Sequence, residues 1–259
     1  MAAVTFGKNI YRLDSVTSTQ EVLKEQFLQG AAEGSIAVAQ EQTLGKGRQG
    51  RSWYSPAGKG LWLSTLIVPS GPEDRWTWVP LWAGVVIQGV LRELLNESQN
   101  QGEVQLRWPN DLMLADGKLG GILAEKVRNP DKRQAVVLGL GLNLLQRKED
   151  FPPHLRNVAV SLLEGTGLSY LPDEVLEKFI LSADGMYSLL KPIDPPRLRD
   201  LWLSAAWGFN RRLRVISGKQ VYEGVFFDLG SCGELCLRGD NGDRICLASV
   251  EGMQKVTIP

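Results

Sequence analysis

The chain has 259 residues, and its 29 Lys and Arg balance 29 Asp and Glu, so the formal net charge is zero. A nucleic-acid-binding domain usually carries a strong basic excess, and the overall balance provides none. The only histidine is His154, which excludes a site with two histidine ligands and disfavours a Ser-His-Asp hydrolase. Three cysteines cannot all pair within one chain, so a reduced, cytoplasmic setting is the simplest interpretation.

No targeting or membrane-spanning segment is predicted. Residues 1–15 lack the apolar core of a signal peptide. The most apolar stretch, residues 79–91, is shorter than the roughly 20 residues that a membrane-spanning helix needs. We therefore expect a cytoplasmic protein with no membrane partner.

The first predicted element is a helix over residues 18–29. Ser18 and Glu21 have the spacing of a capping box, and Gly30 stands where the helix should end. Further along, apolar residues at helical spacing predict a long buried helix over 76–97.

The remaining elements of the first part are strands followed by helices. Apolar patterns predict strands at 35–42, 61–68, 104–108, 119–127 and 135–145, and then helices at 173–190 and 196–205. The last two strands are apolar at nearly every position, so we expect both of their faces to be covered. Several strands follow one another without a helix long enough for a parallel crossover, which indicates an α+β fold.

The character of the chain changes near Trp207. Short strand-like runs then alternate with Gly, Asn and Asp turns, at 213–216, 221–227, 234–238, 244–249 and 254–258. This spacing is typical of a small all-β barrel. About 50 residues are marginal for an independent core, so we expect the barrel to pack on the larger part. The predicted domains are residues 1–208 and 209–259.

Residues 45–50, GKGRQG, match the dinucleotide fingerprint GxGxxG. That fingerprint requires a helix directly after the glycines, but RSWYSPAGKG follows here, so we reject this interpretation. Between residues 43 and 60 there are four cations and no acid, namely Lys46, Arg48, Arg51 and Lys59. Cations on a flexible backbone suit a polyphosphate or another small anion. A solvated surface loop explains the spacing equally well.

Residues 107–111, RWPND, form the second distinctive segment. Pro109 favours an extended Trp108, and the Asn-Asp pair favours a turn, so Asp111 should stand at a strand end. Lys118 begins the next strand, and the two side chains can face one pocket. There Asp111 would hold Mg²⁺ while Lys118 neutralises charge on a phosphoryl oxygen. A hairpin salt bridge is the alternative, which this pair alone favours.

Three segments together resemble the biotin protein ligases, also called biotin–[acetyl-CoA-carboxylase] ligases. They are, in order, GKGRQGRSWYSPAGKGLWLS, RWPNDLMLADGKLGGILAE and VLGLGLNL. The C-terminal part is similar to the family's SH3-like domain. The resemblance implies a catalytic domain of the class II aminoacyl-tRNA-synthetase-like, biotin/lipoyl ligase fold with a mixed sheet. It also implies that the protein uses MgATP to form biotinyl-5′-AMP with release of pyrophosphate, then biotinylates one lysine of a biotin carboxyl carrier protein.

The resemblance also implies roles for individual residues. The implied catalytic residues are Lys118, Arg48 and Asp111, with Mg²⁺ near Asp111. The implied biotin contacts are Ser18, Thr19, Gln42, Gly45, Arg48, Lys118, Gly121, Leu123, Gly139 and Gly141. The implied ATP or AMP contacts are Arg48, Arg51, Trp53, Asn110, Lys118 and Asn143. Two positions depart from the family pattern, because Gln20 replaces the usual asparagine and Lys46 replaces a common arginine.

The chemistry adds an expectation about the loop at residues 45–60. The acyl-phosphate of an adenylate is prone to hydrolysis, so a loop that closes over it would exclude water. We therefore expect this loop to become ordered when biotin or its adenylate binds.

The sequence also bears on three other functions. Some family members carry an N-terminal DNA-binding domain, but the catalytic resemblance begins within the first 20 residues, so we expect no repressor function and no nucleic-acid partner. A lipoate–protein ligase or octanoyltransferase shares the fold and is the closest alternative. A second alternative is an RNA-binding module, which the basic stretch at 191–219 supports. Both a monomer and a homodimer are compatible with the sequence.

Overall fold

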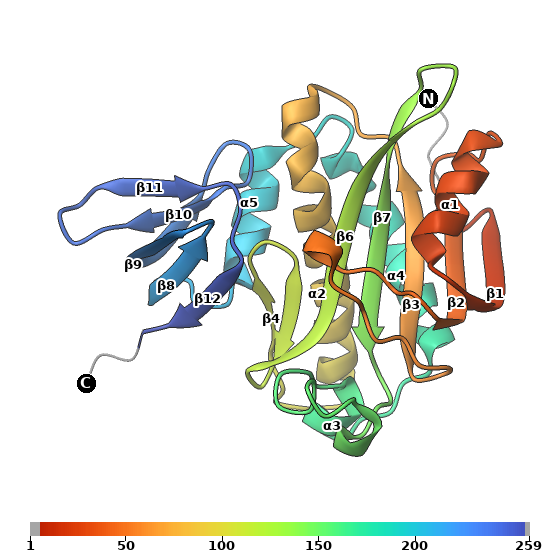
Figure 1. Ribbon diagram of the computed structural model, residues 1–259, viewed down its shortest axis with the longest axis horizontal. Coiled ribbons are helices and arrows are strands. Elements are labelled where there is room, and N and C mark those ends of the chain that lie inside the picture. Colours follow the sequence, from red (N-terminus) through yellow and green to blue (C-terminus); the bar gives the residue numbers. More distant parts are fainter. Residues whose placement is uncertain (1–5, 257–259) are drawn as a thin grey trace.

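The structure is a computed structural model that describes residues 6–256 (Figure 1). The larger of its two sheets contains β1 (Ile10–Val16), β2 (Ile36–Gln42), β3 (Gly60–Ile67), β4 (Val104–Arg107), β5 (Asp111–Leu114), β6 (Gly117–Arg128) and β7 (Gln134–Asn143). The smaller sheet contains β8 (Arg212–Ser217), β9 (Gln220–Leu229), β10 (Leu235–Arg238), β11 (Arg244–Leu247) and β12 (Gly252–Lys255). The helices are α1 (Thr19–Leu28), α2 (Trp78–Glu97), α3 (Leu162–Thr166), α4 (Pro172–Met186) and α5 (Pro195–Ser204).

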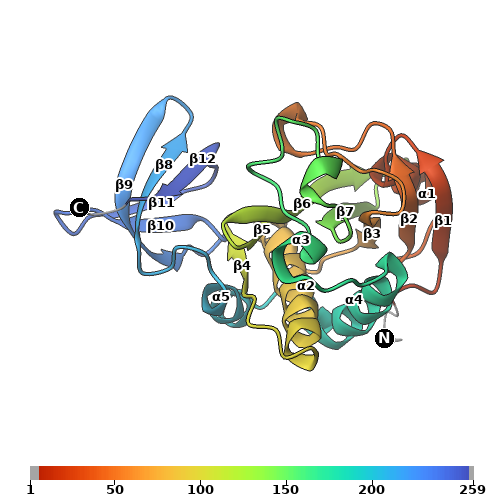
Figure 2. The same cartoon turned by 90° about the horizontal axis from the view of Figure 1, so that it is seen from below.

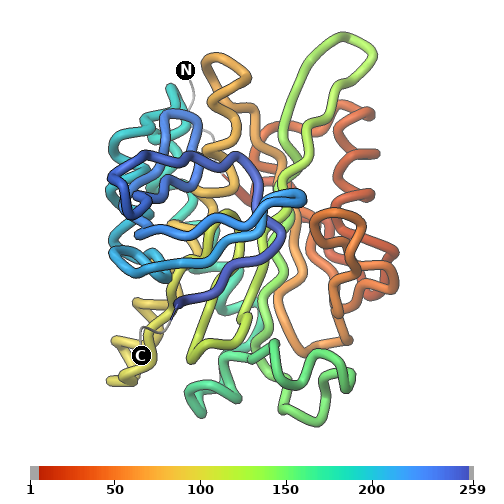
Figure 3. The backbone as a smooth tube through the Cα atoms, turned by 60° about the vertical axis from the view of Figure 1, so that its left-hand side comes forward, coloured from red at the N-terminus to blue at the C-terminus, as the bar shows by residue number. Residues whose placement is uncertain are grey.

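The larger sheet is mixed, in the order β1-β2-β3-β7-β6-β5-β4. Only β1 and β2 are parallel, joined through α1, and the other neighbours are antiparallel. This arrangement confirms the predicted α+β fold. The turn between β6 and β7 extends beyond the rest of the molecule (Figure 3).

Helices cover the two faces of the larger sheet unequally. The long helix α2 packs with α4 and α5 on one face, while α1 contacts β2, β3 and β7 on the other (Figure 2). Because α1 is only ten residues long, it leaves the central part of that second face uncovered by any helix. The candidate site lies there.

Within the described residues every predicted strand and helix forms, but the predicted burial of one strand is wrong. The strand β7 is buried almost throughout, as expected, but β6 alternates between buried and half-exposed positions. The prediction that both faces of β6 are covered is therefore wrong, because one of its faces opens into a cavity. The patterns did not indicate β1 as a strand, since it is an edge strand in which no residue is fully buried.

The start of α1 differs from the predicted capping box. The Ser18 hydroxyl caps the helix by accepting from the backbone N–H of Gln20. The Glu21 carboxylate instead accepts from the ammonium groups of Lys24 and Lys46. The helix itself is confirmed to within one residue at each end.

The second sheet is antiparallel, in the order β11-β10-β9-β8-β12. It packs beside the first sheet, as expected, and two tryptophan side chains join them. The indole N–H of Trp108 donates to the Gly233 carbonyl at 2.8 Å, and that of Trp78 donates to the Ser231 carbonyl at 2.9 Å. The last two residues of the predicted strand at 254–258, residues 257 and 258, lie outside the described residues.

The cysteines depart from the expectation of a fully reduced set. Cys236 on β10 and Cys246 on β11 face each other in the strand register and are joined by a disulfide. Cys232 is a free, half-buried thiol. Sequence spacing gave no indication of this pair, because the register that brings the two residues together is a property of the folded sheet.

The segment Glu73–Glu97 has the length and composition of a membrane-spanning helix. However, 78% of its most apolar window is buried inside the protein. The segment is therefore a core helix, as its periodicity predicted. Among the described residues no other helix meets the same criteria.

Trp82 on α2 lies at the centre of the core. Its side chain is fully buried and its indole N–H donates to the Met186 carbonyl at 3.0 Å. Phe6 stacks on the ring at a centroid distance of 6.0 Å, and Tyr187 packs against it edge-on. This cluster joins α2 to the end of α4.

We predict that Trp82→Ala lowers the free energy of unfolding by about 3–5 kcal/mol, since it leaves a large cavity and an unpaired carbonyl. Urea denaturation followed by circular dichroism measures the change. Leu181→Ala is the control, because that side chain on α4 is 72% exposed and its loss should change stability by less than about 0.5 kcal/mol. Similar losses for both variants would contradict the packing described here.

Candidate active site

A cavity of about 540 Å³ lies on the part of the larger sheet that α1 leaves uncovered. Its floor is formed by β3, β6 and β7, and its walls include the turn between β4 and β5. Predicted residues that line it are Ser18, Thr19, Gln42, Arg48, Arg51, Trp53, Asn110, Asp111, Lys118, Gly121, Leu123, Gly139, Gly141 and Asn143. The structure thus brings together every predicted site residue except Gly45.

Residues 45–53, which we call the flap, fold into a small hairpin over the cavity. Lys46 and Ser52 pair as an isolated bridge, and the Gly47 N–H donates to the Arg51 carbonyl at 2.7 Å. No helix follows the glycines, which confirms the rejection of the dinucleotide fingerprint. Gly45 lies at the base, where an added Cβ would be only 2.5 Å from the Trp53 carbonyl oxygen, so its role is to permit this close approach.

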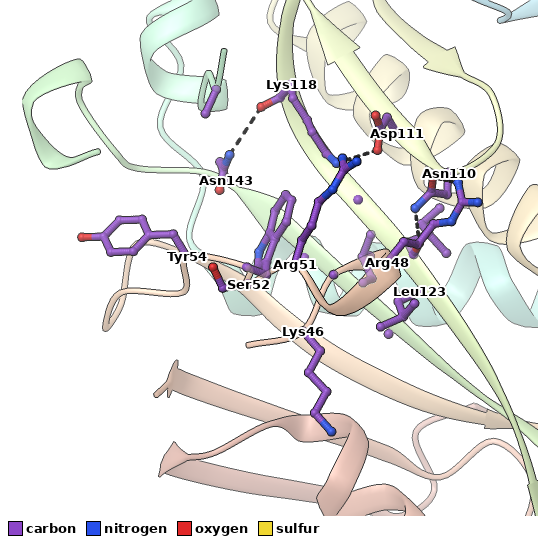
Figure 4. A pocket seen from close by; sticks show the side chains of 18 of the residues that line it. Lys46, Arg48, Arg51, Ser52, Tyr54, Asn110, Asp111, Lys118, Leu123 and Asn143 are labelled. Carbon is purple, nitrogen blue, oxygen red and sulfur yellow. Dashed lines mark hydrogen bonds and ion pairs between the residues drawn. The ribbon is translucent and has the colours of Figure 1, made fainter. Parts of the chain in front are cut away.

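The four cations around the flap do not act as one group. The Lys46 ammonium lies 2.6 Å from Glu21, and that of Lys59 lies 3.1 Å from Asp150. Figure 4 shows Lys46 pointing away from Arg48 and Arg51. The two lysines are thus each paired with an acid, whereas Arg48 and Arg51 lie beside Lys118 at the cavity.

Asp111 connects two cations at the end of the β4–β5 turn. Its Oδ1 lies 2.6 Å from the Lys118 ammonium, and its Oδ2 accepts from the Arg107 guanidinium at 2.7 Å. Burial opposes ionisation of Asp111, but the charges of Lys118 and Arg107 outweigh it and lower its pKa below the usual value. The carboxylate therefore stays ionised and holds the Lys118 ammonium in place at the cavity wall (Figure 4).

This arrangement does not fit Asp111 as a resident magnesium ligand. Both of its oxygens are already paired with cations, whereas Mg²⁺ prefers several free oxygen ligands. Across residues 6–256 no three acidic, histidine or cysteine side chains are grouped as a metal site would require. The assignment of Asp111 as an Mg²⁺ ligand stays a prediction, and in this structure both of its oxygens are paired with cations.

Arg48 reaches from the flap to the opposite wall. Its guanidinium donates to Asn110 Oδ1 at 3.1 Å, and the Asn110 amide donates to the Ile122 carbonyl at 2.6 Å. Burial lowers the pKa of Arg48, while the nearby Asp111 charge opposes this effect. The guanidinium is thus a half-buried cation that closes one side of the cavity mouth.

The indole of Trp53 lies directly on the glycines of the floor. Gly121 and Gly141 pair across β6 and β7, and a Cβ built on Gly141 would be 2.3 Å from Trp53 Nε1. The Lys118 ammonium lies 5.3 Å from the ring centroid, within the range of a cation–π contact. The buried Nε1 has no hydrogen-bond partner among the described residues. Glycine is needed at residue 141 because a side chain would displace Trp53.

A network of buried hydroxyl and amide groups forms the inner end of the cavity. Gln42 Oε1 accepts from the Thr19 backbone N–H at 2.9 Å and from the Thr19 hydroxyl at 3.1 Å. The Thr19 and Ser64 hydroxyls are 2.8 Å apart, and the Gln42 amide donates to Ser55. Neither serine was predicted from the sequence. A serine inside the apolar run of β3 was the one available signal for Ser64.

Gln20 and Asn143 use their amide groups to hold backbone segments. The Gln20 amide donates to the carbonyls of Leu123 and Val137 at 3.0 and 3.3 Å, which ties α1 to β6 and β7. A Cβ on Gly139 would lie 3.1 Å from Gln20 Cδ, so the long side chain fits only over a glycine. The Asn143 amide donates to the Val160 carbonyl at 3.1 Å.

The C-terminal sheet also contributes to the cavity, which the sequence did not indicate. Residues 250–253, which lead into β12, line part of it. These residues are far from the flap in sequence and carry no recognisable motif, so only the packing of the two sheets reveals them.

Comparison with known proteins agrees with this fold. The model of the biotin/lipoate A/B protein ligase family matches residues 12–143. The biotin–[acetyl-CoA-carboxylase] ligase of Mycobacterium tuberculosis is 30% identical over 249 residues, which cover 94% of this chain and 88% of that protein. The bifunctional ligase/repressor BirA of Bacillus subtilis is 29% identical, over 95% of this chain and 74% of that protein.

Solved structures give the same result. A biotin protein ligase from Aquifex aeolicus, in complex with biotin and ATP, superimposes with a TM-score of 0.80 at 28% identity, covering 96% of this chain and 100% of that chain. The fold is thus that of the ligases that join biotin or lipoate to a protein. The chain belongs to the biotin/lipoate A/B protein ligase family. The resemblance drawn from the three sequence segments is confirmed.

We predict that Gly141→Ala displaces Trp53 from the floor. The added methyl group overlaps the indole, so the tryptophan fluorescence should shift and biotin binding should weaken about tenfold or more. Fluorescence spectra and calorimetric titration with biotin measure the two effects. Gly185→Ala on α4 is the control, because nothing lies within 4 Å of its added Cβ. Unchanged fluorescence and affinity in Gly141→Ala would refute the stacked position of Trp53.

We also predict a pH-dependent role for Asp111 in stability. Because its pKa is lowered in the folded state, its contribution is full above the unfolded value of about 3.9 and is lost as the pH falls through the lower folded value. Asp111→Asn should therefore lower the free energy of unfolding by about 2 kcal/mol at neutral pH, less than for a fully buried pair because Lys118 is 33% exposed.

The difference between Asp111→Asn and the unmodified protein should shrink below about pH 4. Urea titrations across a pH series measure it. Asp116→Asn is the control, because it makes the same chemical change in the exposed turn that follows β5, and Asp116 forms no ion pair among the described residues. This variant should alter stability little at neutral pH. If the stability difference between Asp111→Asn and the unmodified protein is the same at every pH, the ion pairs do not cause it.

Proposed function

We propose that the protein is an ATP-dependent biotin protein ligase. It activates biotin as biotinyl-5′-AMP, with release of pyrophosphate, and transfers biotin to one lysine of a biotin carboxyl carrier protein. The observation that carries this proposal is the meeting of Arg48, Arg51 and Lys118 in a cavity whose opposite end is a network of buried hydroxyl and amide groups. The ligase relatives, which align along most of both chains, support it.

The first step joins two anions that repel each other. An oxygen of the biotin carboxylate attacks the α-phosphorus of ATP, and the bond to pyrophosphate breaks. Cations near the reacting atoms offset this repulsion and the charge that develops on the phosphoryl oxygens. Lys118, which Asp111 holds at the cavity wall, and the two flap arginines are placed to do so.

We infer that Mg²⁺ enters the site as part of the MgATP substrate. The triphosphate oxygens would be its main ligands, since both oxygens of Asp111 are paired with cations. In this proposal Asp111 is a positioning residue for Lys118.

In the second step the carrier lysine attacks the acyl carbon of the adenylate, and AMP leaves. The attacking amine must lose a proton. Asp111 is a poor acceptor for that proton, because Lys118 and Arg107 lower its pKa. We therefore do not assign it as a base, and the flap's role is to keep water from the adenylate until the carrier arrives.

The direct experiment is incubation with ATP, Mg²⁺, biotin and a carrier domain, followed by mass spectrometry. We expect the mass gain of one biotinyl group on a single lysine, and none without ATP. Lipoic acid in place of biotin tests the other branch of the family. Modification with lipoic acid but not with biotin would overturn the proposal.

We predict that Lys118→Ala reduces biotin-dependent ATP–pyrophosphate exchange by about 100-fold or more, because an ammonium group that stabilises the transition state is lost. Lys126→Ala is the matched control, since Lys126 lies on the same strand, pairs with Glu73 and does not line the cavity. That variant should retain near-normal exchange. Equal rates for the two variants would remove Lys118 from the mechanism.

A further inference from the structure

The flap is held firmly at its base and by few polar contacts between residues 46 and 52. At and beyond the base, the Gln42 amide donates to Ser55, and the Tyr54 hydroxyl donates to the Asp150 carbonyl at 3.1 Å. Among the described residues, two side chains between residues 46 and 52 form hydrogen bonds to the body of the protein: Arg48 reaches Asn110, and Lys46 reaches Glu21. Together with the packing of Trp53 on Gly141, these two contacts hold the flap closed.

The two contacts differ in what substrate binding does to them. Arg48 and Asn110 both line the cavity, and in the proposed reaction both contact the substrates, so their mutual hydrogen bond competes with substrate. Glu21 does not line the cavity, and Lys46, which lies at its edge, points away from the arginines (Figure 4). The ion pair between Lys46 and Glu21 therefore does not have to break when the substrates bind and react.

This contact belongs to a chain of ion pairs that reaches the cavity floor. The Glu21 carboxylate lies 2.6 Å from the Lys46 ammonium and 2.9 Å from that of Lys24, and Lys24 lies 3.1 Å from Glu125 on β6. Hydrogen bonds from Lys46 and Lys24 lower the pKa of Glu21, so the carboxylate stays charged at neutral pH. These ion pairs thus link the flap to the first turn of α1, and α1 to β6 beneath the cavity.

We propose that Glu21 is a positioning residue that latches the flap through Lys46 and slows the escape of the acyl-adenylate into water. This inference rests on the proposed function. Glu21 touches no reacting atom, and it acts by lowering the fraction of time that the flap is open. The latch replaces a contact that substrate would otherwise have to supply, and it leaves Arg48 free to bind the substrates.

The size of the effect follows from the exposure of the pair. The Lys46 and Glu21 side chains are 45% and 40% exposed, and ion pairs of this kind change an equilibrium by roughly two- to five-fold. Salt screens such pairs, so the advantage of the latched protein should diminish at high ionic strength.

The experiment measures how fast preformed adenylate leaves the enzyme when no carrier is present. The protein is loaded with biotin and α-labelled MgATP, and a trap of unlabelled biotin reports the release rate. Glu21→Gln should release adenylate about two- to five-fold faster at low salt, and the difference should disappear at high salt. Glu25→Gln, one turn further along α1, is the matched control, because Glu25 is exposed and has no ion pair among the described residues.

A double-mutant cycle isolates the latch from other effects of the substitutions. Lys46→Gln should match Glu21→Gln, and the double variant should release adenylate no faster than either one. Equal release from Glu21→Gln and the unmodified protein, or additive effects in the double variant, would overturn the latch. Glu21 is on the surface, so thermal unfolding should show little change in any variant.

A second measurement separates failure of the latch from failure of the proposed function. Trypsin cleavage after Arg51 reports flap opening in the absence of any reaction, and Glu21→Gln leaves the flap sequence unchanged. We expect faster cleavage in Glu21→Gln than in Glu25→Gln. If the unmodified protein shows no biotin-dependent exchange, the proposed function fails, and equal cleavage rates of these two variants would reject the latch itself.

Discussion

Asp111 holds Lys118 and Arg107 at distances of 2.6 and 2.7 Å, and the polar side of the cavity is arranged around this three-residue ion cluster. A half-buried ammonium group is stable there only because a carboxylate offsets its lost hydration, and the carboxylate is stable only because two cations do the same for it. The strand register makes the cluster possible, since Arg107 and Asp111 are partners across β4 and β5. Chemistry at the site therefore depends on a tight hairpin.

The second constraint is the absence of side chains on the floor. Gly139 and Gly141 lie on the face of β7 that faces α1 and the cavity, and each provides space for a larger group. Gln20 occupies the space above Gly139, and Trp53 lies on Gly141. Small residues on one strand thus admit a helix side chain and a flap side chain to the same sheet, and the remaining volume is the cavity.

Local patterns predicted most elements because the long helix α2 and the buried strand β7 carry strong periodic signals. They missed β1, an edge strand with little buried surface, and they misjudged β6, whose one face is a cavity wall and not packed core. The pairing of Cys236 with Cys246 depends on strand register, which the sequence does not display. Lys46 and Lys59 looked like anion ligands because their partners, Glu21 and Asp150, are distant in sequence.

The sequence by itself determined the family, the fold class and which residue types meet in the cavity, because ordered motifs and periodic burial are local properties of the chain. Only the tertiary structure decided how the charges are distributed among those residues. It paired both oxygens of Asp111 with Lys118 and Arg107, and it turned Lys46 away from the arginines towards α1. The physical reason is that Coulomb interactions depend on distances of a few ångströms between side chains, and those distances exist only after strands, helix and flap have packed together.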